Sequence, residues 1–230
     1  MNSARNLFFS KTFWHLAVLF ILCLISFGNS FNNGFLLDDY GFLLREDSLR
    51  SVSGLSLWIK AFRDYYRPVA FNLLRLESLA FGNRAYGYHI FNLVLFWLVC
   101  LMFYFILRKL FKNIEVPFLA ASLYCVHPFN SFLVNYKTAS NISFHLLFMQ
   151  ASVLFFIYYL DHRKLKLYVL SLAFYLLALL SHEISFMLPF DLFLLMYFLM
   201  KGELINHNMQ VLQLEGEQEK YKMSNSSFFL

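Results

Sequence analysis

Long runs of apolar residues recur from one end of the chain to the other, and they constrain its fold more than any other feature. The runs occupy residues 12–30, 89–107, 116–136, 143–160, 167–181 and 184–200. A helix needs about 20 mostly apolar residues to cross a bilayer. Hydrophobic residues make up 60% of the chain and charged residues 14%, against about 45–50% and about 25% in soluble domains. The sequence therefore predicts an all-α fold, a polytopic integral membrane helical bundle of about six transmembrane helices.

Two other interpretations of the apolar runs stay open. The chain could be a very apolar globular protein, or its first run could be a cleaved signal peptide that ends near Gly28 and Ser30. A polytopic protein needs no separate signal, so we interpret the first run as a spanning helix.

The basic residues predict the orientation of the bundle. Three lysines or arginines follow the second run and three follow the fourth, whereas the loop after the third run carries only Lys137. Because short cytoplasmic loops are rich in Lys and Arg, we expect both termini in the cytoplasm and the first loop, 31–88, on the outer side. The net charge of +5 follows from this topology and does not indicate nucleic acid as a partner. The host membrane is expected to be the bacterial inner (cell) membrane or, alternatively, that of the endoplasmic reticulum.

The expected domain organisation follows from the same runs. Residues 1–200 should form the transmembrane domain, and residues 201–230 a polar cytoplasmic tail without stable structure.

The first loop contains two adjacent carboxylates, Asp38 and Asp39, and two amphipathic patterns. Apolar residues recur at helical spacing in each pattern: Leu55, Ile59, Phe62 and Tyr66 in the first, and Val69, Leu73, Leu76 and Ala80 in the second. Pro68 fits the first turn of the second helix, where its missing N–H costs little. We expect two interfacial helices here, lying on the membrane with their charged side chains in water. Ordinary loop helices that pack on protein are the alternative.

Polar side chains gather near the predicted outer ends of the spans. They are His89, Asn92, His127, His145, His182 and Glu183. Ionisable groups within spans usually face the interior of a bundle, so this pattern predicts a polar cavity that opens outward. The three cysteines, in contrast, lie within apolar runs and lack disulfide or metal-binding spacing. We interpret them as structural thiols and expect no metal site.

Several short motifs, in this order, resemble those of one enzyme superfamily. They are Asp38-Asp39, Tyr65-Tyr66-Arg67-Pro68, Gly87-Tyr88-His89-Ile90-Phe91-Asn92, His127-Pro128, and Ser181-His182-Glu183 followed by Pro189. Over about residues 10–200 the chain is similar to the lipid-dependent membrane glycosyltransferases of the GT-C class. The nearest likeness is to the protein O-mannosyltransferase-like branch, which includes TMTC-type proteins with tetratricopeptide repeats. That branch usually has Lys where this chain has His182, and its members have more spans, so a truncated chain is expected.

The resemblance implies an inverting transferase that uses a polyprenyl-phosphate sugar, such as a dolichyl-phosphate-mannose-like donor. The acceptor would be a protein or glycolipid hydroxyl on the outer face. Asp38 would be the general base and Asp39 its supporting or second catalytic group. Arg67 would bind the donor phosphate. The other candidates for the donor and substrate site are Tyr66, His89, Asn92, His127, His182 and Glu183, with Arg84 and Lys137 as secondary cations.

No cofactor is required by this chemistry, although some members of the class use a divalent metal. Asp38, Asp39 and Glu183 are the oxygen donors that would ligate one. Two alternatives to an enzyme stay open: a transporter or flippase for a lipid-linked sugar, and a truncated, non-catalytic membrane scaffold.

Overall fold

The structure, a computed structural model, describes residues 2–45, 48–198 and 201, with side chains from Lys11 onward. These residues are helical apart from turns and one isolated bridge between Phe62 and Tyr65, which confirms the all-α prediction. The chain divides into two compact units, Met1–Phe186 and Met187–Leu230. The predicted tail, 202–230, lies outside the described residues.

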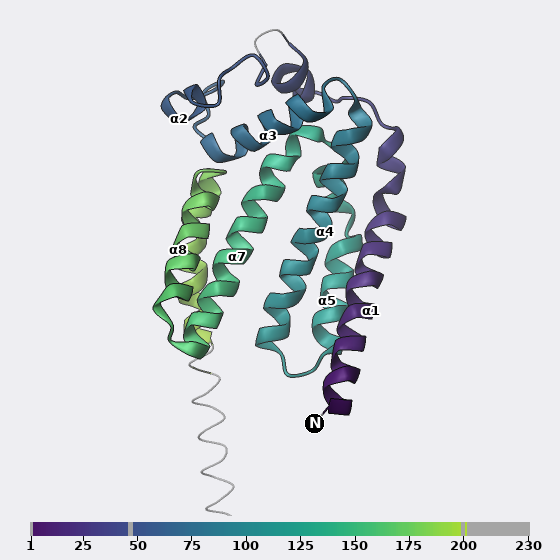
Figure 1. Cartoon of the computed structure of the whole chain (residues 1–230), viewed down its shortest axis with the longest axis vertical. Helices are drawn as coiled ribbons and strands as arrows, with labels where there is room; N and C mark the ends of the chain where they lie inside the picture. The colour runs from purple at the N-terminus through teal and green to yellow at the C-terminus, as the bar shows by residue number, and fades with distance from the viewer. Residues whose placement is uncertain (1, 46–47, 199–200, 202–230) are drawn as a thin grey trace, which may run out of the picture. The chain divides into compact units, whose positions relative to one another are not determined.

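Five helices of the first unit run lengthwise beside one another (Figure 1). They are α1 (Asn2–Phe27), α4 (Ala85–Leu110), α5 (Glu115–Val126), α7 (Ser140–His162) and α8 (Leu165–Leu179). A sixth helix, α3 (Pro68–Phe81), lies across one end of this bundle and packs on α7. The first loop and the one-turn helix α2 (Ser56–Ile59) are at the same end.

Three of the helical segments are long and apolar enough to cross a membrane. They are Lys11–Asn32, Ala85–Leu110 and Lys137–His162. The predicted third and fifth spans correspond to the shorter apolar helices α5 and α8, of 12 and 15 residues. The predicted sixth span covers the short 3-10 helix η5 (Glu183–Met187) and helical residues 188–198, which belong mostly to the second unit. The structure thus supports a membrane protein with three candidate spanning helices.

Local sequence explains where several helices begin and end. Pro68 is the first residue of α3, as predicted, and the preceding Arg67, with φ of −131° and ψ of 63°, lies outside the helical region, which a residue before proline avoids. The same effect ends α5 at Val126, since Pro128 follows an extended His127. Arg108 and Lys109 lie in the last turn of α4, where positive charge is favourable.

The predicted amphipathic helix over Leu55–Tyr66 is wrong beyond its first turn. Helix α2 ends at Ile59, and the chain then turns back through Arg63 and Asp64, both with positive φ. The Phe62 ring packs against Phe42 and Phe71 instead of lying on a helical stripe. Tertiary packing of an aromatic side chain therefore overrides the helical spacing of the sequence.

Two apolar clusters hold the first unit together. The larger one joins α1, α4 and α5 and includes Leu19, Phe96 and Tyr104, none of which is exposed. The smaller one joins the first loop, α3 and the start of α4 and includes Leu43 and Phe71. Gly87 lets α3 approach α4, because a Cβ at this position would lie 2.6 Å from the Phe81 ring.

Candidate functional site

Two segments far apart in the sequence are joined at the end of the bundle that carries α3. The first is the loop 33–39 and the second is residues 134–139, which include the 3-10 turn η4 (Lys137–Ala139) before α7. His89 and Asn92, one helical turn apart on α4, lie between them. The His89 ring nitrogens are 3.0 Å from the Asn33 carbonyl oxygen and 3.2 Å from that of Val134.

Asn92 joins the same region through its side-chain amide. Its amide donates hydrogen bonds to the carbonyl oxygens of Tyr136 and Lys137, at 2.9 and 3.3 Å. Both His89 and Asn92 are fully buried. The sequence placed these two residues on one face of one helix, and their role in the structure is to fix the backbone around the carboxylates.

Asp39 is the anchor of the first loop. Its carboxylate accepts hydrogen bonds from the backbone N–H groups of Leu36 and Thr138, each at 2.9 Å, and the residue is fully buried. Lys137 is also fully buried, and its ammonium donates to the Gly34 carbonyl oxygen and lies over the Phe35 ring. The negative charge of Asp39 attracts the positive charge of Lys137. We refer to Asp39, Lys137, His89 and Asn92, with the backbone that they bind, as the clamp.

Asp38 faces the other way. It is exposed, and its backbone N–H, not its carboxylate, donates to the Tyr136 hydroxyl at 3.0 Å. The residue before it, Leu37, has φ of 41°, a conformation that costs a branched side chain of order 1–2 kcal/mol. The clamp therefore holds the loop in a strained shape in which the Asp38 side chain is exposed beside the Tyr136 hydroxyl.

Asp38 and Arg67 line the same cavity, of about 190 Å³. Its other walls come from the first loop, α3 and residues 132–142: Phe42, Tyr65, Leu74, Phe132, Tyr136, Thr138, Ala139, Asn141 and Ile142. Binding sites for drug-sized ligands are usually about 300–1,000 Å³. This cavity is therefore large enough only for a small group, with acidic, basic and hydroxyl side chains around it.

Arg67 is bound on its far side by Glu183. Its guanidinium donates two hydrogen bonds to the carboxylate, at 2.8 Å from Nε and 2.5 Å from Nη2, and stacks over the Tyr65 ring at 4.6 Å. The hydrogen bonds from Arg67 lower the pKa of Glu183 to about 2. The two residues therefore form an ion pair across the neutral pH range, and this pair sets the direction of the guanidinium.

Two histidines lie beside this ion pair. Burial, and then the positive charge of Arg67, lower the pKa of His182, so its ring is neutral at pH 7. His145 of α7 is buried and hydrogen-bonded to the Ser185 hydroxyl at 2.6 Å. The positive charge near Glu183 comes from Arg67, so His182 does not replace the lysine of the branch that the motifs resemble.

Tyr66 and His127 are not brought to the cavity. The Tyr66 hydroxyl donates to the Trp58 carbonyl oxygen at 3.1 Å, and Tyr65, not Tyr66, lines the cavity. His127 is exposed, and its Nδ1 accepts a hydrogen bond from the backbone of Phe129, as a cap of the following turn.

Sequence reasoning did not select Tyr136 and Thr138, although both line the cavity. Their signal was weak: a polar stretch, Tyr136-Lys137-Thr138, before an apolar run. It also overlooked Glu77 of α3, which is 4% exposed and whose closest hydrogen-bonding group among the described residues is the Ser140 hydroxyl, outside ordinary hydrogen-bond geometry. Burial raises the pKa of Glu77 to about 8, so this side chain is neutral at pH 7.

The predicted oxygen donors do not converge on a metal position. Both carboxylate oxygens of Asp39 are used by backbone N–H groups, and Glu183 is bound to Arg67. Within the described part of the chain, one group of three metal-binding side chains occurs, and it consists of the three cysteines.

No protein-family model, no curated protein and no solved structure matches the chain.

Proposed function

We propose that this chain is a membrane glycosyltransferase that moves a sugar from a polyprenyl-phosphate carrier to an acceptor hydroxyl on the non-cytoplasmic face. The observation that carries the proposal is the cavity that Asp38 and Arg67 share. It supplies one exposed carboxylate and one oriented guanidinium, the two groups that transfer from a lipid phosphate needs. The likeness of the motifs to the GT-C class supports the same activity.

In the proposed reaction, Asp38 acts on the acceptor and Arg67 on the donor phosphate. The acceptor oxygen attacks the anomeric carbon and Asp38 takes the hydroxyl proton as general base. The bond from the anomeric carbon to the phosphate oxygen breaks, inversion follows from attack on the opposite face, and the polyprenyl phosphate leaves with the electron pair.

The leaving phosphate gains negative charge, which preorganised cationic donors stabilise. An arginine has five N–H donors, and Glu183 accepts two of those of Arg67. We assign the remaining donors to the phosphate. Because the Glu183 ion pair fixes the guanidinium before the donor arrives, little reorganisation is needed on binding.

Only the sugar and phosphate would enter the cavity, since its volume of about 190 Å³ excludes a lipid tail. The tail would stay among the exposed apolar side chains next to the cavity, such as Leu36 and Leu37, at 45% and 83% exposed. An outward position of the first loop and a bundle of six spans complete the proposal.

The test compares transfer by the purified protein and its Asp38→Asn variant, with a polyprenyl-phosphate sugar and cell-envelope acceptors. We expect transfer to fall about 10²–10⁴-fold, the usual contribution of a general base, while donor binding is unchanged. Asn at this position keeps the backbone hydrogen bond to Tyr136, so folding should be preserved. Asp161→Asn is the matched control, because Asp161 is an exposed carboxylate paired with Lys109 near the end of α7.

Equal sugar release by the wild type and Asp38→Asn would contradict the proposal. The same experiment in vesicles addresses the flippase alternative, because a flippase needs no base and its flux would survive the substitution.

A further inference from the structure

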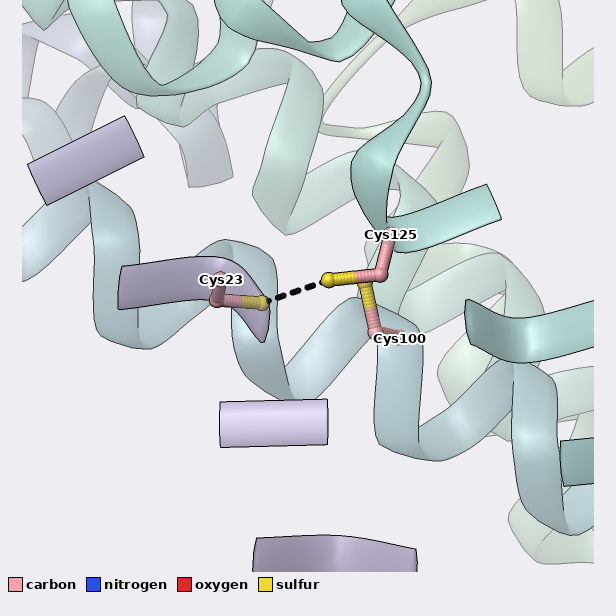
Figure 2. A group of neighbouring side chains, drawn as sticks. All are labelled: Cys23, Cys100 and Cys125. Atoms are coloured by element: carbon pink, nitrogen blue, oxygen red, sulfur yellow. Dashed lines mark hydrogen bonds between the residues drawn. The ribbon is translucent and has the colours of Figure 1, made fainter. Parts of the chain in front are cut away.

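The three cysteines of the chain meet at one point in the bundle. Cys23 comes from α1, Cys100 from α4 and Cys125 from α5, and Figure 2 shows the side chains of Cys23 and Cys125 pointing toward each other above that of Cys100. Their sulfur atoms all lie within 4.8 Å of one another, and those of Cys23 and Cys125 are 3.0 Å apart. None of the three residues is exposed. Residues 77 and 25 positions apart in the sequence thus place three thiols around one centre.

The surroundings of this centre are apolar. The cysteines belong to the cluster that includes Leu19, Leu93 and Phe96, and no carboxylate or imidazole joins the group in the described part of the chain. The nearest polar contact is weak, a Cys125 Sγ to Leu19 carbonyl distance of 3.8 Å. The centre therefore offers three soft sulfur donors and no hard oxygen or nitrogen donor.

We propose that Cys23, Cys100 and Cys125 bind one Cu(I) ion. Thiolates select soft cations, among them Cu(I), Zn²⁺ and iron in clusters. Structural Zn²⁺ takes four ligands, and this dry centre has three. Cu(I) is a closed-shell ion that accepts three sulfur ligands.

The geometry requires small movements only. Three sulfurs at about 2.3 Å from one ion lie about 4 Å from one another. Cys23 and Cys125, at 3.0 Å, must therefore separate by about 1 Å, a shift within reach of rotation about χ1. Each thiol that binds as a thiolate releases its proton to the solvent. Since the ligands come from three helices, the ion would join α1, α4 and α5, and this role is independent of the transferase activity proposed above.

The first experiment titrates Cu(I) into the detergent-purified, reduced protein under anaerobic conditions, in competition with a colorimetric Cu(I) chelator. We expect one ion per chain, three sulfur neighbours by X-ray absorption at the copper edge, and a higher melting temperature of the loaded protein. Each single Cys→Ser variant should bind at least tenfold more weakly. Ser122→Ala is the control, because Ser122 is also on α5 but bonds the Phe118 carbonyl oxygen.

A second measurement needs no variant, so a misfolded mutant does not weaken the test. In the wild type, bound Cu(I) should protect all three thiols from a membrane-permeable maleimide, counted by mass. Binding that survives the Cys→Ser substitutions, unprotected thiols, or Zn²⁺ binding as tight as that of Cu(I) would each overturn the assignment. Oxidation to a Cys23–Cys125 disulfide in place of metal binding would do so as well.

Discussion

The clamp around Asp39 and the ion pair of Arg67 lie at the same end of the bundle and differ in what surrounds them. Asp39 and Lys137 are fully buried, and backbone groups satisfy their charges. Glu183 has 65% of its side chain exposed, and it binds another side chain. The clamp must form for the loop to have its shape at all, whereas the ion pair is in contact with solvent and orients a single side chain.

This difference separates structural from chemical roles among acidic residues that look alike in sequence. Asp38 and Asp39 are neighbours, yet the Asp39 carboxylate binds backbone N–H groups outside the cavity lining, whereas Asp38 lines the cavity. We infer that Asp39 acts in the proposed reaction as a positioning residue for Asp38. Four predictions would sharpen or break this comparison.

The largest effect is expected in the clamp. Replacing Lys137 by Met removes the donor of the Gly34 carbonyl oxygen and a positive charge that attracts Asp39. A buried acceptor left without its partner costs about 1–3 kcal/mol, and more where a charged group is involved. Asp39→Asn should cost a similar amount, because an amide cannot accept both backbone N–H groups. The double variant should lose less stability than the sum of the two, in denaturation monitored by circular dichroism.

Lys109→Met is the control for this cycle. Lys109 pairs with Asp161 at 2.9 Å, but the two side chains are 29% and 47% exposed, so the loss should stay below about 1 kcal/mol. If Lys137→Met were equally mild, the clamp would not be structural.

The next effect concerns Glu77, a buried carboxyl without the partners that Asp39 has. Burial raises the pKa of this carboxyl from its ordinary value of 4.5, which applies to the unfolded chain, to about 8 in the folded chain. The fold therefore holds a proton that the unfolded chain loses, so stability should fall as pH rises from about 4.5 to 8 and level off above. Glu77→Gln removes this dependence and should stabilise the protein by about 1–3 kcal/mol at pH 9. A melting temperature measured from pH 4 to 9 checks this, and parallel curves for wild type and variant would contradict it.

A smaller effect is expected for the ion pair. The pKa of Glu183 is lowered, so its contribution is present above about pH 4.5 and lost as pH falls through about 2. Since the carboxylate is mostly exposed, Glu183→Gln should cost only about 0.2–1 kcal/mol of stability at pH 7. The rate of sugar transfer should fall by more than this loss of stability explains, because Arg67 loses its orientation. An equal fall in Asp161→Asn would show that the loss is unspecific.

The smallest effect is expected at Leu37. Asn tolerates positive φ better than Leu, so Leu37→Asn should stabilise the protein by less than about 1 kcal/mol. Leu36→Asn makes the same change of polarity at a neighbouring position without positive φ and should not stabilise. Calorimetry of the two variants and the wild type checks this prediction, and equal melting temperatures for Leu37→Asn and Leu36→Asn would contradict it.

The sequence predicted those parts of the fold that depend on local pattern. It correctly predicted the long apolar segments that contain α1, α4 and α7, and the start of α3 at Pro68. The turn at Arg63 and Asp64 was not, because helical spacing carries no information about the packing of the Phe62 ring in the smaller cluster.

The site shows the same division. The motif resemblance selected Asp38 and Arg67, and the structure places both on one cavity. It gave no sign that Tyr136 and Thr138 form the opposite wall, because that wall results from hydrogen bonds between distant segments. Glu77 was overlooked for a related reason: its burial depends on how α3 packs against α7, and no local pattern encodes this.

The spacing of these contacts along the chain has a consequence for biogenesis. Asp38 and Tyr136 are 98 positions apart, and Arg67 and Glu183 are 116 apart. Since a chain emerges from the ribosome N-terminus first, the carboxylate and the guanidinium are made long before the residues that hold them. Asp38 therefore lacks its contact until residue 136 has been synthesised, and Arg67 lacks its contact until the turn after α8 has been synthesised.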